Sequence, residues 1–179
     1  ARAIGSAYRV YSFEPEEFNF SLLLRCARSR RMEGRIVPIQ SAVGAEDGTL
    51  ELWRNEHHSG DHRVLTSQLR GSGAGSDAVS VPVTTIDSCI RKSGPLQPIS
   101  FIKVDVQGYE FPVCRGMEQT LMDNPNAVLA LEYAPESMLE LGFEPLEMLR
   151  WLEERGYATY SLSRNGSLTP GVPSELGQA

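Results

Sequence analysis

Ile99-Ser-Phe-Ile-Lys-Val-Asp-Val-Gln-Gly-Tyr-Glu110 is the stretch that decides the fold. Its apolar, largely β-branched run from Phe101 to Val106 predicts a strand that is buried on both faces of a parallel sheet. The run breaks at Gly108, and a helix is expected at once because Pro112 suits a first helical turn. Asp105 therefore lies at the carboxyl end of the strand, where open α/β sheets bind their ligands.

Two other segments repeat this pattern of a buried strand that finishes in an acid. Tyr8–Glu14 and Asn126–Tyr133 are both rich in apolar residues, and their carboxylates are Glu14 and Glu132. Because parallel strands present their carboxyl ends at one edge of a sheet, these two acids and Asp105 are expected to converge on one crevice.

The other regular elements follow from periodicity and turn residues. We expect a helix over 16–31, strands over 35–43, 48–53 and 79–86, and a closing hairpin about 165–166. The strand over 48–53 alternates polar and apolar residues, as antiparallel strands do. Pro82 suggests an edge position or a bulge for the strand that contains it.

Composition bounds the class of protein. The chain has 179 residues, 41% of them hydrophobic and 22% charged, which indicates one globular domain. Its net charge is -6, its arginines are scattered, and no apolar run approaches the roughly 18 residues of a membrane span. Three widely spaced cysteines without a CxxC pair favour a reducing compartment. We expect one cytoplasmic domain over 1–179, with a flexible insertion at 54–78, a loose tail at 170–179, and neither a nucleic-acid nor a membrane partner.

The central stretch also carries a family resemblance. Ile102–Glu110, followed by Cys114-Arg-Gly116 and Leu121, resembles the "IKIDVEGAE…LKG…L" signature of the FkbM family of S-adenosylmethionine-dependent methyltransferases. Ser12-Phe-Glu-Pro15 is similar to the family's "FEP", and Val79–Asp87 is similar to its "V…TLD" segment. These segments occur in the order in which the family has them.

The resemblance covers about residues 8 to 162 and implies an α/β fold of the Rossmann-like class I methyltransferase type. Such a fold has a mostly parallel sheet, in this chain with a β-hairpin insertion and an antiparallel C-terminal strand. In the family, a strand with a glycine-rich turn precedes the point that matches Ala1–Gly5 and wraps the methionine part of the cofactor. We expect this chain to lack that first strand.

The resemblance also implies a cofactor and a reaction. The cofactor is S-adenosylmethionine, and the expected reaction is O-methylation of a hydroxyl on a sugar or natural product, so the partner is a small-molecule or glycan acceptor. Glu14 is the expected ribose ligand, although it could instead cap the next helix. Ser41 and Ala42 are placed near the adenine, and Ser41 could equally be an ordinary strand-end serine. Asp105 would face both the sulfonium and the acceptor.

Two kinds of residue are candidates for the catalytic base. Glu132 is one candidate, and a histidine of the 57–62 loop, with His58 as the first choice, is the other. His57, His58, His62 and Asp61 could alternatively bind a metal or form an exposed polar loop, and we expect no metal. The family commonly has an acid where this chain has Gln107, so an acid–base or metal role of that family position is not carried over to this chain.

Two further hypotheses for the chain stay open. One is a catalytically inactive Rossmann-like binding module that lacks the donor-binding first strand. The other is an unrelated nucleotide-binding α/β enzyme that uses the same strand-end acids. All hypotheses that place a ligand at the crevice require Glu14 and Asp105 to lie at a shared rim.

Overall fold

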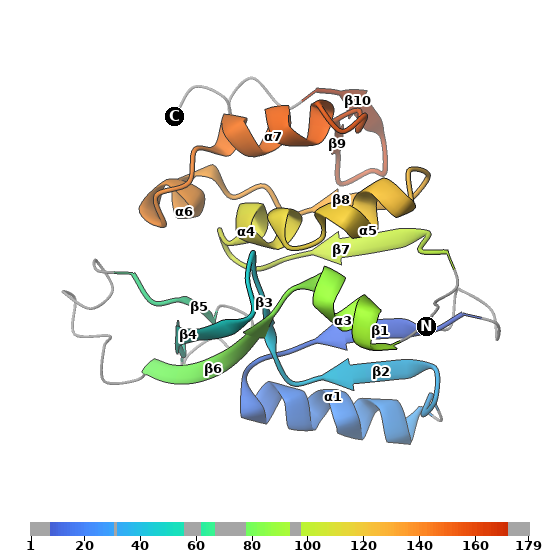
Figure 1. Ribbon diagram of the computed structural model, residues 1–179, viewed down its shortest axis with the longest axis vertical. Helices are drawn as coiled ribbons and strands as arrows, with labels where there is room; N and C mark the ends of the chain where they lie inside the picture. The colour runs from blue at the N-terminus through green and yellow to red at the C-terminus, as the bar shows by residue number, and fades with distance from the viewer. Residues whose placement is uncertain (1–7, 31, 56–61, 67–77, 94–97, 172–179) are drawn as a thin grey trace.

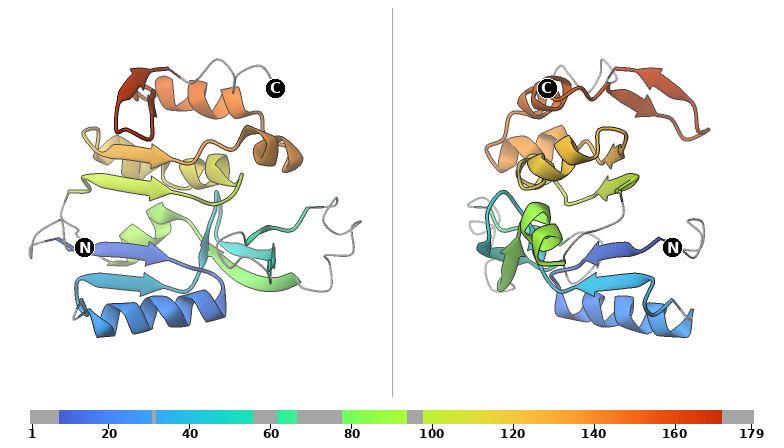
Figure 2. Two further views of the ribbon diagram at one scale, coloured as in Figure 1. Left: turned by 180° about the vertical axis from the view of Figure 1, so that it is seen from behind. Right: turned by 45° about the vertical axis from the view of Figure 1, so that its right-hand side comes forward.

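Two pairs of parallel strands run side by side through the molecule (Figure 1). The computed structural model describes residues 8–30, 32–55, 62–66, 78–93 and 98–171. The pairs are β1 with β2 and β7 with β8, where the strands span Val10–Phe13, Ile36–Ile39, Phe101–Val104 and Val128–Leu131. Figures 1 and 2 show β1 and β7 as neighbours that point the same way, although no backbone ladder joins them in the described residues.

A mixed sheet of four strands lies beside these pairs. Its order is β3-β6-β4-β5, with β3 parallel to β6 and the other pairs antiparallel. These strands span Ala42–Val43, Ala78–Thr84, Gly48–Trp53 and Arg63–Val64. The antiparallel pairing of β4 with β6 agrees with the antiparallel strand expected over 48–53. The structure also places the short strand β5 within the stretch that was expected to be a flexible insertion.

The strand predicted over 35–43 is wrong as one continuous element. It is divided into β2 and β3, which belong to different sheets. The cause is local: the Ser41 N–H donates to the Ile39 carbonyl, which closes a tight turn at Gln40, and the Ser41 hydroxyl donates to the Pro82 carbonyl. The chain beyond Gln40 therefore leaves β1 and pairs with β6.

Pro82 lies within β6, which is an interior strand of its sheet rather than an edge strand. On one side Pro82 is in register with Thr49 of β4. On the other side the ladder with β3 starts only at Val83, opposite Ala42. The position is thus locally like an edge, which is where a residue without a backbone N–H fits a sheet.

Each of the described helices has an acid in its first turn, which suits the positive end of the helix dipole. They are α1 (Glu17–Ser29), α3 (Ile86–Ser93), α4 (Glu110–Arg115), α5 (Glu118–Asp123), α6 (Pro135–Glu140) and α7 (Pro145–Glu153). The C-terminal hairpin is β9 (Tyr160–Leu162) with β10 (Leu168–Pro170), a separate antiparallel pair about Asn165 and Gly166. None of the helices within the described ranges is long and apolar enough to cross a bilayer.

The hydrophobic core lies between the β7–β8 pair and the helices that follow it. Its buried members come from β3, β7, α4, α5, α6 and α7, and they include Val104, Met117, Leu121, Met138, Met148 and Leu152. The expectation that the central strand is buried on both faces is wrong. Phe101 and its register partner Val128 are 58% and 60% exposed, so the face opposite the core is open to solvent.

One close backbone approach ties α4 to the mixed sheet. A Cβ atom added at Gly116 would overlap the carbonyl oxygen of Gly44, which follows β3 directly. We predict that Gly116→Ala lowers the free energy of unfolding by about 1–3 kcal/mol or more, because the overlap is with backbone that cannot rotate away. Chemical denaturation would measure the change. The matched control is Gly48→Ala, where an added Cβ meets no atom within 4 Å; equal effects of the two substitutions would contradict the packing argument.

Candidate functional site

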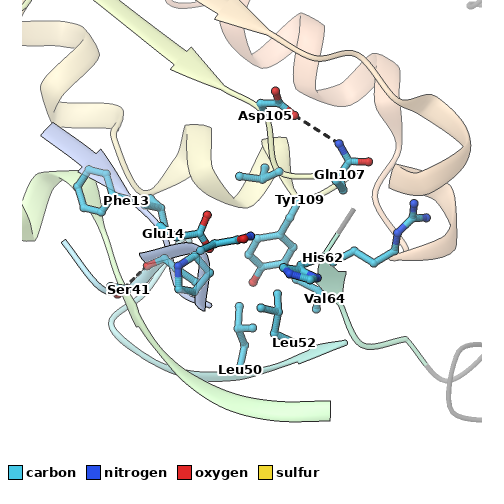
Figure 3. A pocket seen from close by; sticks show the side chains of 16 residues that line it. Phe13, Glu14, Ser41, Leu50, Leu52, His62, Val64, Asp105, Gln107 and Tyr109 are labelled. Atoms are coloured by element: carbon cyan, nitrogen blue, oxygen red, sulfur yellow. Dashed lines mark hydrogen bonds between the residues drawn. The ribbon is translucent and has the colours of Figure 1, made fainter. Parts of the chain in front are cut away.

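A cavity of about 250 Å³ lies at the carboxyl ends of β1 and β7 (Figure 3). The β4–β5 hairpin forms its opposite wall. The side chains labelled in Figure 3 that line it are Phe13, Glu14, Ser41, Leu50, Leu52, His62, Val64, Asp105, Gln107 and Tyr109. Four of the expected donor and catalytic positions, Glu14, Ser41, Ala42 and Asp105, therefore meet around one space.

Glu14 follows the last residue of β1 and is half-buried at the cavity. Its Oε1 accepts the backbone N–H of Glu16 at 2.9 Å, which orients the carboxylate. Burial raises the pKa of Glu14. The residue that caps α1 is instead Glu16, whose Oε2 accepts the Asn19 N–H at 2.8 Å. The capping role that was the alternative for Glu14 thus belongs to its neighbour.

Ser41 and Ala42, which were expected near the adenine, also line the cavity. Ser41 is 6% exposed, and its hydroxyl lies at 2.8 Å from the Ala42 carbonyl and 3.0 Å from the Pro82 carbonyl. A hydroxyl has one proton to donate, and here that proton is used within the protein. Ser41 therefore joins β3 to β6 and shapes the cavity wall.

Asp105 and Glu132 stand side by side beyond the ends of two hydrogen-bonded strands. Val104 and Leu131 are register partners in β7 and β8, so the residues that follow them are neighbours. The Gln107 amide nitrogen lies 2.9 Å from Glu132 Oε2 and 3.3 Å from Asp105 Oδ1, and it bridges the two carboxyls. Lys103 Nζ is 2.6 Å from Asp105 Oδ2, so the lysine of the central signature pairs with a neighbouring carboxylate.

The two carboxyls have opposite pKa shifts. The hydrogen bond with Glu132 and the Lys103 ammonium lower the pKa of Asp105. The same hydrogen bond with Asp105 is the main cause that raises the pKa of Glu132 to about 7, and burial and the charge of Asp105 add to it. Two adjacent acids that cannot both ionise freely share one proton, so the pair holds a proton near neutral pH.

A strained turn connects β7 to α4 and carries part of this site. Gln107 has φ +53°, and Gly108 has φ +99°. A non-glycine residue in the left-handed region costs about 1–3 kcal/mol, so the surroundings must hold Gln107 there. Gly108 also has no room for a side chain, because an added Cβ would lie 2.7 Å from the Ser137 backbone carbon.

Only one of the three histidines is within the described residues. His58, the expected base, lies outside them, as do His57 and Asp61. His62 lines the cavity, and its Nδ1 accepts the Asn55 N–H at 3.1 Å. A neutral ring with this bond carries its proton on Nε2, so His62 suits hydrogen-bond donation better than proton abstraction. No three His, Cys, Asp or Glu side chains converge as a metal-binding group in the described part of the chain.

Sequence reasoning missed several contributors to the cavity, Tyr109 and two leucines of β4 among them. Tyr109 lies within the central signature, lines the cavity and packs edge-on against Phe143 at 5.9 Å between ring centroids. Leu50 and Leu52 of β4 point from the hairpin toward the cavity (Figure 3). Tyr109 could have been noticed as an aromatic residue beside the strand-end turn. The hairpin leucines carry no signal, because alternation alone does not tell which ligand space a strand faces.

The fold is that of a mixed α/β protein, and two acids, Glu14 and Asp105, line a cavity at its strand ends. The chain belongs to the FkbM methyltransferase domain family, whose model matches residues 1–159. A crystal structure of the methyltransferase FkbM from Methylobacillus flagellatus KT has a similar fold, with a TM-score of 0.51 and 18% identity over 91% of this chain. This chain spans 34% of the length of that protein. No curated protein matches the sequence.

The raised pKa of Glu132 predicts a pH-dependent cost of folding. In the folded protein the pKa of Glu132 is about 7, above the ordinary value of 4.5. As pH rises, the unfolded chain therefore releases this proton first. The free energy of unfolding then falls between pH 4.5 and pH 7. We predict that Glu132→Gln removes this loss. Because the carboxyl is exposed and screened by solvent, we expect the loss in the free energy of unfolding to be about 1 kcal/mol. This corresponds to about 2–4 °C in Tm.

Thermal unfolding at pH 5 and pH 8 measures this effect. The Tm of Glu132→Gln minus that of the wild type should be larger at pH 8 than at pH 5. A difference in Tm that does not change with pH would contradict the shared-proton arrangement. Glu136→Gln, at an exposed glutamate of α6, is the matched control for the chemical change itself.

Proposed function

We propose that this chain is the catalytic domain of an S-adenosylmethionine-dependent methyltransferase that acts on a hydroxyl of a sugar or natural product. The observation that carries the proposal is the meeting of Glu14 and Asp105 at one cavity. These residues are far apart in sequence and follow strands that no backbone ladder joins within the described residues. Membership of the FkbM methyltransferase domain family supports the same conclusion.

The residues that would hold the donor form one wall of the cavity. Glu14 would accept hydrogen bonds from the ribose hydroxyls, because a carboxylate at this strand end is placed for that contact. The backbone of Ser41 and Ala42, with Leu50 and Leu52 opposite, would enclose the adenine. Asp105 would face the sulfonium, and its lowered pKa keeps it negative over the physiological pH range.

The bound donor supplies an already activated methyl group on a sulfonium. The protein therefore mainly has to align the attacking hydroxyl, a task that can contribute roughly 7–11 kcal/mol to lowering the barrier. We assign Glu132 as the base that accepts the hydroxyl proton, because its pKa of about 7 suits proton transfer at neutral pH. Glu132 contacts the cavity through Gln107, which lines it. His62 would donate a hydrogen bond to an acceptor oxygen.

We further propose that β1, β2, β7 and β8 belong to one Rossmann-like, mostly parallel sheet. The place of the family's first strand would be between β1 and β7. These two strands point the same way as neighbours, and no ladder joins them in the described residues (Figures 1 and 2). In that arrangement the cavity lies where open parallel sheets bind nucleotides.

Calorimetric titration of the full-length protein with S-adenosylhomocysteine tests the proposed function. We expect binding by the wild type, and a loss of affinity of about 10- to 100-fold for Glu14→Ala, the range for losing hydrogen bonds to a charged group. Glu17→Ala, at an exposed acid in the first turn of α1, is the control and should bind like the wild type. Absence of binding by the full-length wild type would refute the assignment.

The Asp105–Glu132 pair predicts that discrimination between donor and product depends on pH. Above pH 7 the pair carries a second negative charge, because the pKa of Glu132 is about 7. That charge favours the sulfonium of S-adenosylmethionine over the neutral thioether of S-adenosylhomocysteine. The ratio of the two Kd values should therefore shift toward S-adenosylmethionine between pH 6 and pH 8, and Glu132→Gln should make it independent of pH. A ratio that stays constant in the wild type would contradict this role.

A further inference from the structure

Glu110 is a fully buried acid to which the proposed reaction gives no role. It opens α4 and is 0% exposed. Its Oε1 accepts two backbone N–H groups of the preceding turn, from Val106 at 3.2 Å and from Gly108 at 3.1 Å. Its Oε2 is buried without a hydrogen-bond partner in the described residues. Burial also raises the pKa of Glu110.

Burying a carboxyl with an unpartnered oxygen is unfavourable in free energy. The two hydrogen bonds of Glu110 to the turn therefore call for a structural or functional explanation. The turn holds Gln107 at φ +53° and Gly108 at φ +99°, a conformation that Gln107 does not favour. Because Glu110 accepts bonds on both sides of Gln107, its carboxyl fixes the backbone that precedes and follows this residue. From there the Gln107 amide reaches Asp105 and Glu132.

We propose that Glu110 is a positioning residue for the candidate site, whose buried carboxyl holds the left-handed turn so that the Gln107 amide bridges Asp105 and Glu132. The effect of Glu110 on cofactor binding and catalysis rests on the proposed function, in which Asp105 faces the donor and Glu132 is the base. The geometry that the positioning role explains involves only residues of this chain. The role can therefore be tested with and without a ligand.

The first test needs no ligand. In the full-length protein, the side-chain amide signal of Gln107 is followed by ¹H–¹⁵N NMR and assigned by its loss in Gln107→Ala. We expect Glu110→Ala to move this signal toward that of a solvated amide, and Glu110→Gln to keep it, because glutamine retains an oxygen that can accept both backbone N–H groups. Val113→Ala, at a buried apolar position of the same helix, is the control for general loosening and should leave the signal in place.

The second test is the affinity for S-adenosylhomocysteine. Glu110→Ala should weaken binding roughly tenfold or more, as loss of charge-assisted hydrogen bonds does, while Glu110→Gln should stay within about threefold of the wild type. If Glu110 acts through Gln107, the double variant Glu110→Ala with Gln107→Ala binds no more weakly than the weaker single variant. Additive losses, or equal losses for Glu110→Ala and Glu110→Gln, would overturn the proposal.

The two tests separate this inference from the proposed function. If the wild type fails to bind S-adenosylhomocysteine, the proposed function fails, and the Gln107 signal still decides whether Glu110 positions the turn. If Glu110→Ala does not fold, Glu110→Asp replaces it, because the shorter side chain retracts the carboxyl from the turn but keeps its charge. A Gln107 signal and an affinity unchanged by Glu110→Asp would then overturn the proposal.

Discussion

Parallel pairing of β7 with β8 is the constraint on which the candidate site depends. The register sets Val104 opposite Leu131, and the Glu132 N–H closes the ladder on the Val104 carbonyl at 3.0 Å. Two acids must then emerge together at the strand ends, where their charges repel. A shared proton, the Lys103 ammonium and the Gln107 amide all offset that repulsion. The electrostatic character of the site is therefore a consequence of strand register.

The cavity itself is assembled from pieces that no backbone ladder joins within the described residues. Glu14 comes from the end of β1, Asp105 from the end of β7, and the opposite wall from the β4–β5 hairpin. Close packing outside the cavity links these pieces, as where α4 ends at Gly116 against the Gly44 carbonyl. A change at such a contact is transmitted to the cavity walls, because close-packed interiors have low compressibility and transmit strain.

Much of the site was predictable because strand ends are encoded locally. An apolar run that stops at an acid and a glycine places Asp105 correctly, and the same reasoning places Glu132 and Glu14. Other predictions failed where a competing partner decided the outcome. The strand predicted over 35–43 is divided in two because the Ser41 hydroxyl donates a hydrogen bond to the Pro82 carbonyl, which lies far along the chain. Loop residues lack any such local signal, and the choice of His58 as a base stays a prediction because His58 lies outside the described residues.

By itself, the sequence determined most of the strands, the helices that begin near Glu17 and Glu110, and the positions of three strand-end carboxylates. Apolar periodicity and turn residues act over a few neighbours, so local letters suffice for them. Only the tertiary structure decided that Glu14 and Asp105 share a cavity, that Gln107 bridges two acids, and that the buried carboxyl of Glu110 holds the turn between them. These relations join atoms that are brought together by the packing of separate sheets and helices, and no local pattern records such distances.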